Sequence, residues 1–228
     1  MLTNFSDFDS AVMAKIDQEL VDSVRIRLMG GMLTNALISS TYCVMCCERV
    51  LPNYYAFSRA TGARTYQIFR DIVDNLWRML EDERGFNHRK LDAERLSAVD
   101  FVLDDQKHEL APSAANAVAI ADIIYRNFPN CSLENAEECR EFVLHDIVRF
   151  LMGTALNINL RFKDVPAYIF SGELWTHEIS LHKNIVAILD GGGDIEEKVR
   201  AVKHKVLQES LSNIGVVNER KAHGVKRQ

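Results

Sequence analysis

Proline and glycine are scarce in this sequence, with four prolines and eleven glycines among 228 residues. They cluster between periodic segments, and that placement favours long helices over many short strands. No segment of useful length alternates apolar and polar side chains with the period of two that marks a half-buried strand. These absences predict an all-α fold, organised as a single-domain helical bundle of about seven or eight helices.

Long apolar runs are missing too. The most apolar stretch, residues 111–125, is interrupted by Asn116 and Asp122 and is too short to span a bilayer. The first ten residues carry two aspartates and no lysine or arginine, unlike a secretory signal. The five cysteines are therefore expected to be reduced thiols in a cytoplasmic protein with no membrane partner.

Catalytic signatures are missing as well. The chain has no nucleophile elbow, dinucleotide fingerprint, kinase signature or Ser/His/Asp order. A Cys-x-x-Cys, Cys43 to Cys46, lies inside an apolar helix, where burial should raise the thiol pKa. Gly191–Gly193 resembles a phosphate loop but is followed by acidic residues, so it is interpreted as a turn. We predict no catalytic residues and no cofactor.

Three Glu/His pairs are spaced four residues apart, so each pair shares one helix face. A di-iron bundle needs Glu-x-x-His, which this chain lacks. We therefore interpret the pairs as solvated ion pairs and predict no metal site. The pairs are Glu141 with His145, Glu173 with His177, and Glu178 with His182.

Apolar periodicity and capping residues define the expected helices. Pro52 should break a buried helix or start the next turn. Pro112 should open another helix, and Ser132 and Asp194 should cap two more. Residues 1–217 are expected to form the domain and residues 218–228 a basic, disordered tail. The helices are expected at 10–28, 32–51, 53–60, 64–84, 92–104, 113–127, 133–157, 172–190 and 194–211.

One polar cluster interrupts this apolar pattern. Glu48 and Arg49 stand at the end of the buried helix, and a buried charge must be paired or hydrogen-bonded. Neighbours beyond Pro52 and on the next long helix are expected within reach. The cluster forms either a ligand site or, as we prefer, a structural network that fixes the angle between two helices. The candidate ligand-binding residues are Glu48, Arg49, Asn53, Tyr54, Gln67 and Arg70.

Charge is unevenly distributed along the chain. Residues 198–228 hold eight basic and two acidic residues, although the net charge of the whole chain is −5. This basic arm has no aromatic residues for stacking on bases, and the rest of the chain is acidic. Nucleic acid is therefore an unfavoured partner.

Several short runs resemble the YjaG-like family of uncharacterised bacterial proteins. The resemblance is dense over residues 36–80 and thinner towards the C-terminal helix. It implies an all-helical bacterial protein and no particular reaction. The runs are Cys47-Glu48-Arg49, Pro52-Asn53-Tyr54, Phe57, Thr61-Gly62, Gln67-Ile68, Arg70, Asp74, Trp77 and Ser212-Asn213-Ile214-Gly215.

The sequence is compatible with three hypotheses for the function of the protein. The first is a non-enzymatic helical protein that acts by self-association or by binding a protein partner. The second is a small-molecule-binding or enzymatic site at Glu48, Arg49, Asn53, Tyr54 and Arg70. The third is contact with nucleic acid through the basic arm.

Overall fold

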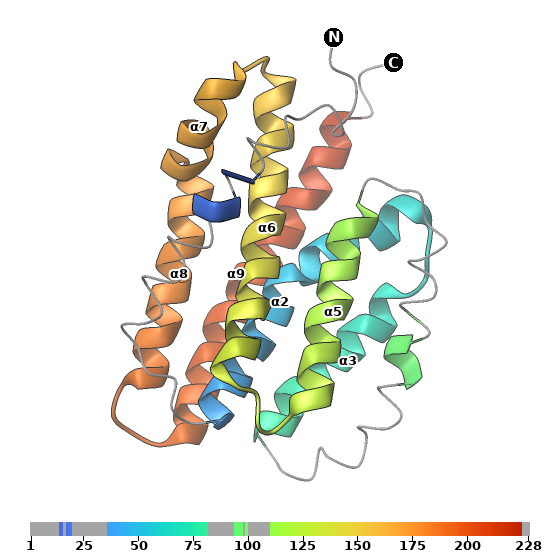
Figure 1. Ribbon diagram of the computed structural model, residues 1–228. Helices are drawn as coiled ribbons and strands as arrows, with labels where there is room; N and C mark the ends of the chain where they lie inside the picture. Colours follow the sequence, from blue (N-terminus) through green and yellow to red (C-terminus); the bar gives the residue numbers. More distant parts are fainter. Residues whose placement is uncertain are drawn as a thin grey trace. The chain divides into compact units, whose positions relative to one another are not determined.

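The computed structural model describes residues 14–15, 17–19, 36–81, 94–97, 99 and 110–224. Within these ranges the chain forms helices and turns and contains no β-strand, which confirms the all-α prediction (Figure 1). Seven α-helices have defined bounds in the described part of the chain, and the helical residues 14–15, 17–19, 94–97 and 99 belong to two more. The predicted count of seven or eight helices is therefore slightly low. Most of the helices predicted at 10–28 and 92–104 lie outside the described residues.

The chain divides into two compact units, so a single domain is not confirmed. The first unit combines Met1–Met32 with Leu144–Ala187, and the second combines Leu33–Val143 with Ile188–Gln228. None of the described helices is long and apolar enough to cross a membrane.

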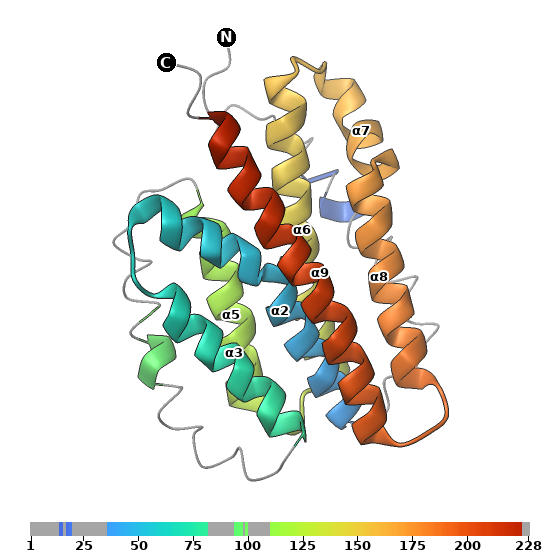
Figure 2. The ribbon, with the colours of Figure 1, turned by 180° about the vertical axis from the view of Figure 1, so that it is seen from behind.

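Helix α2 (Ala36–Thr61) is the central helix of the second unit. It packs against α3 (Tyr66–Glu81), α5 (Ala111–Asn127) and α9 (Ile195–Gly224). Figures 1 and 2 show α5 on one side of α2 and α9 on the other. Every residue from Ser39 to Pro52 is buried, as expected for a helix that is apolar on several faces.

Pro52 does not end this helix, and the prediction of a break there is wrong. Proline has no N–H to donate to the carbonyl of Glu48, a loss that disfavours the helix interior by about 3 kcal/mol. Burial of α2 against three neighbouring helices outweighs that cost. The helix ends at Thr61, and Gly62 follows with a φ of +74°, the left-handed conformation expected of a helix-terminating glycine.

Helix α3 lies beside α2 with a narrow apolar stripe toward the core. Phe69, Ile72, Leu76 and Trp77 are fully buried, whereas Ile68 is 38% exposed. At 100° per residue it stands at the edge of the stripe, in the first turn of the helix.

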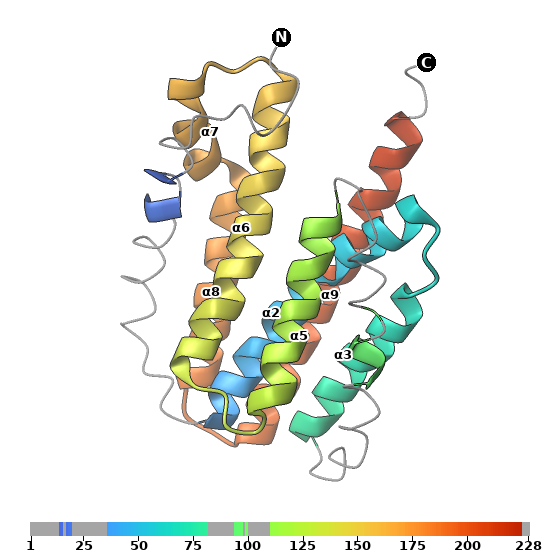
Figure 3. The same ribbon diagram turned by 45° about the vertical axis from the view of Figure 1, so that its right-hand side comes forward.

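Helix α5 allows a close approach to α2 because it is lined with alanines. Pro112 lies in its first turn, as predicted, and Ala114, Ala117 and Ala121 are fully buried. The Sγ atom of Cys47 on α2 lies 4.0 Å from the carbonyl oxygen of Ala117. Figure 3 shows the two helices side by side.

Helix α6 (Leu133–Asn157) begins in the second unit and continues in the first. The Oγ of Ser132 accepts a hydrogen bond from the Asn135 N–H at 3.2 Å, so the predicted N-cap is confirmed. Val143 and Leu151 are buried, and Phe150 is 39% exposed. The inward face of α6 in the first unit also carries Leu144, Val148, Met152 and Ala155.

The first unit also contains η3 (Phe162–Asp164), α7 (Val165–Ser171) and α8 (Glu173–Asp190), the last of which ends in the second unit. Trp175 of α8 packs against Phe170 with ring centroids 5.1 Å apart. Helix α7 carries Pro166 in its first turn, where a proline is tolerated because that N–H needs no partner within the helix.

Helix α9 begins at the predicted cap. The Asp194 carboxylate accepts backbone hydrogen bonds from Glu196 at 3.1 Å and Glu197 at 3.3 Å. Gly193, with a φ of +113°, forms the turn before it. The helix extends to Gly224, beyond the end expected near residue 211.

Candidate functional site

The side chain of Glu48, in the middle of α2, is fully buried. It accepts hydrogen bonds from two side chains of α3. Its Oε1 lies 2.6 Å from Nη1 of Arg70, and its Oε2 accepts a hydrogen bond from Nε1 of Trp77 at 3.2 Å. Arg70 and Trp77 are seven residues apart, so they stand on one face of α3. Both carboxylate oxygens are thus hydrogen-bonded by the protein itself.

Arg70 is held from its other side by Asp74. The Nε of Arg70 donates to Oδ1 of Asp74 at 3.1 Å, and its Nη2 bonds to the same oxygen. Burial lowers the pKa of Arg70, but the hydrogen bonds to Glu48 and Asp74 outweigh it and leave that pKa above its ordinary value. We call Glu48, Arg70, Asp74 and Trp77 the Glu48 network.

The Glu48 network joins two helices through a buried ion pair. The side chain of Glu48 is 1% exposed and that of Arg70 is 16% exposed, so water screens the pair only weakly. Removal of one partner from such a pair strands the other charge in the interior. This arrangement fits the structural network that we preferred for the polar cluster.

Two of the other predicted residues, Gln67 and Tyr54, form hydrogen bonds with residues outside the Glu48 network. Gln67 is exposed, and its amide donates to Asp71 at 2.9 Å. The hydroxyl of Tyr54 donates to Thr65 at 2.7 Å, and its ring stacks on Phe69 with centroids 4.5 Å apart. Burial raises the pKa of Tyr54 to about 12, against a smaller lowering by Thr65.

Arg49 and Asn53 lie on α2, where Arg49 is buried and Asn53 is half-buried. Two members of the Glu48 network, Asp74 and Trp77, were not among the predicted site residues. Both could have been predicted from the sequence, because they follow Arg70 at spacings of four and seven on a helix and so share its face.

All five cysteines are buried, and none forms a disulfide. Cys43 of α2 forms side-chain hydrogen bonds with Cys131 and Cys139. The bond with Cys131 lowers the pKa of Cys43, but the bond with Cys139 and burial raise it well above the ordinary value. Burial, with a smaller contribution from the charge of Glu48, also raises the pKa of Cys47.

Native thiols should consequently react slowly with an aromatic disulfide reagent at Cys43, Cys46 and Cys47. Each unit by which a thiol pKa rises lowers its thiolate fraction about tenfold, and burial blocks access. Titration in denaturant is the control and should release all five thiols at once. Rapid native reaction at any of these three would contradict the burial argument.

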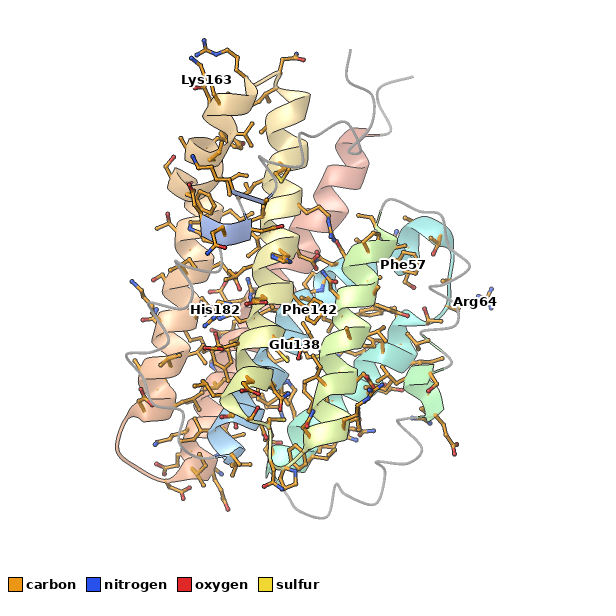
Figure 4. All side chains as sticks on the ribbon, in the orientation of Figure 1. Phe57, Arg64, Glu138, Phe142, Lys163 and His182 are labelled. Atoms are coloured by element: carbon orange, nitrogen blue, oxygen red, sulfur yellow. The ribbon has the colours of Figure 1, made fainter. Side chains whose placement is uncertain are left out.

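The Glu/His pairs differ from one another in environment. Glu178 and His182 of α8 are buried with Oε1 and Nε2 3.3 Å apart, so their interpretation as a solvated pair is wrong. Figure 4 labels His182 on α8. They lie on the inner face of α8, as does Ile185, which is fully buried. Glu173 and His177 are exposed, as expected. The Nε2 of His145 lies 3.6 Å from an oxygen of Asp17.

No cluster of three or more histidine, cysteine, aspartate or glutamate residues in the described part of the chain could hold a metal ion.

The start of the basic arm packs against the rest of its unit. Val199, Val202 and Val206 are fully buried. Lys203 of α9 forms an ion pair with Glu81 of α3 at 2.8 Å.

Comparison with known proteins places the fold among helical proteins of unassigned activity. A solved structure of a DUF416 family protein from Shewanella baltica OS155 superposes with a TM-score of 0.67 at 16% identity, covering 80% of this chain and 93% of that one. The uncharacterized protein YjaG of Escherichia coli K12 is 30% identical over 103 residues, which are 43% of this chain. The match spans 50% of the length of YjaG.

A family model described as a protein of unknown function, DUF416, matches residues 35–217. That range contains α2, the Glu48 network and the start of the basic arm. The resemblance noted from the sequence is thereby confirmed, and this chain belongs to the DUF416 family.

Proposed function

We propose that this protein is a non-enzymatic helical protein that acts by self-association or by binding a protein partner. The observation that carries the proposal is the state of Glu48, whose two carboxylate oxygens are both hydrogen-bonded by α3. A catalytic acid or a ligand-binding carboxylate needs an oxygen that is available to its substrate. The cluster best suited to a ligand is instead engaged in holding two helices together.

The other reactive side chains support the same proposal. The pKa values of Cys43 and Cys47 are raised, which suits buried structural thiols rather than nucleophiles. Lys203 pairs with Glu81, so this part of the basic arm is engaged within its own unit. We also propose a bacterial cytoplasmic location, because unpaired thiols persist in reducing compartments and both relatives come from bacteria.

Exposed apolar side chains are the natural starting point for the contact surface. Among the described residues, five large apolar side chains are exposed. Three of them, Phe150, Ile158 and Leu174, belong to the first unit, and Ile158 is the most exposed of the five at 56%. Such residues mark association surfaces when they form a patch. A charged residue introduced at one of these positions in the first unit should therefore weaken the proposed contact.

Sedimentation velocity across a concentration series tests this proposal, together with capture of partners from a bacterial lysate. The wild-type chain should either self-associate or retain a defined protein, and Ile158→Asp should weaken that contact. Ile68→Asp is the matched control in the second unit, where Ile68 is 38% exposed. A chain that stays monomeric and retains no protein, yet carries a small molecule from its host, would contradict the proposal.

A further inference from the structure

Arg140 is a second buried arginine, located on α6 within the second unit. Its side chain is 3% exposed. Among the described residues, its Nε and Nη1 atoms are buried and have no hydrogen-bond partner. A buried arginine is normally paired, because an unpaired charge in the interior is costly.

The groups that act electrostatically on Arg140 come from two helices. Tyr42 and Cys46 belong to α2, and the half-buried Glu137 and Glu141 belong to α6 itself. Burial lowers the pKa of the Arg140 guanidinium, and these groups only partly offset that effect. The guanidinium nevertheless stays charged at neutral pH, because arginine does not lose its proton in proteins.

The contrast with Arg70 shows what is missing at Arg140. The Nε, Nη1 and Nη2 atoms of Arg70 all meet carboxylate oxygens, and its pKa is raised. Arg140 has carboxylates in its neighbourhood, but no acceptor at Nε or Nη1. The protein supplies acceptors for all three nitrogens of Arg70, whereas two nitrogen atoms of Arg140 have no acceptor.

We propose that Arg140 is an anion-binding residue whose guanidinium hydrogen-bonds the oxygens of a small carboxylate or phosphate group. A planar guanidinium matches the geometry of both groups. Because Arg140 is almost fully buried, the ligand is a small molecule rather than a side chain on the surface of a partner. This binding site is independent of the proposed association function.

Melting curves of the full chain in acetate or in inorganic phosphate, compared with chloride at equal ionic strength, test the assignment. Either anion should raise the wild-type melting temperature in a saturable way by about 2–4 °C. Arg140→Met should remove this response. In chloride the same variant should melt at or above the wild-type temperature, because it removes an unpaired buried charge.

Two further variants complete the design. Arg126→Met is the matched control, since Arg126 is exposed and paired with Asp122 at 2.7 Å, and it should keep the wild-type response. Arg140→Lys keeps the charge without the planar fork and should weaken anion binding about tenfold. The proposal is overturned if neither anion stabilises the wild type, if Arg140→Met or Arg140→Lys responds as the wild type does, or if Arg140→Met melts several degrees lower in chloride.

Discussion

Replacement of Glu48 by alanine is expected to lower the free energy of unfolding by about 3–5 kcal/mol. The variant would leave Arg70 without its buried partner and Trp77 without an acceptor for its indole N–H. For a chain of this length the loss corresponds to a drop in melting temperature of at least about 6 °C. Thermal or urea unfolding monitored by circular dichroism measures it.

Glu48→Gln is the matched variant for this test. The amide preserves the shape of the side chain, and its oxygen still accepts a hydrogen bond from Arg70 or Trp77. The charge is lost and one bond is broken, so we expect a smaller cost of about 1–3 kcal/mol. If both variants melt at or above the wild-type temperature, Glu48 belongs to an open ligand site and not to a structural network.

Replacement of Arg70 by methionine should have a comparable effect from the other side of the ion pair. The methionine keeps most of the apolar stem but leaves the Glu48 carboxylate buried without its cation, at a cost of about 3–5 kcal/mol. The measurement is the same unfolding experiment, with the far-ultraviolet spectrum confirming that the helices persist.

Asp74→Asn is the control for the Arg70 variant. Asp74 also bonds Arg70, but its side chain is 43% exposed, so its contribution should be about 0–1 kcal/mol. Equal losses for Asp74→Asn and Arg70→Met would indicate that the partly exposed contact, rather than the buried pair with Glu48, carries the stability.

Much of the fold could be predicted from periodicity and capping. The Ser132 and Asp194 caps and the Gly62 terminator are local features, because a side chain or a glycine satisfies backbone groups a few residues away. Pro52 could not be predicted in the same way. Its effect on α2 depends on burial against helices that are distant in the sequence, and tertiary packing overrides local propensity.

The candidate site was predictable only in part. A buried charge requires a partner, and this rule correctly joined Glu48 to Arg70. Gln67 and Tyr54 lie within one or two helical turns of these residues in sequence, but their side chains bond to Asp71 and Thr65 instead. Arg140 could not be predicted as a binding residue from the sequence. Its buried N–H groups have no acceptor, and no residue spacing indicates this.

A double-mutant cycle on Glu48→Ala and Arg70→Met tests the structural role of the Glu48 network most directly. The two side chains are in contact, so the losses of the single variants should not add. We predict a coupling energy of about 1–3 kcal/mol, so that the double variant loses clearly less stability than the sum of the two single losses. Additive losses, with a coupling energy below about 0.5 kcal/mol, would contradict the account.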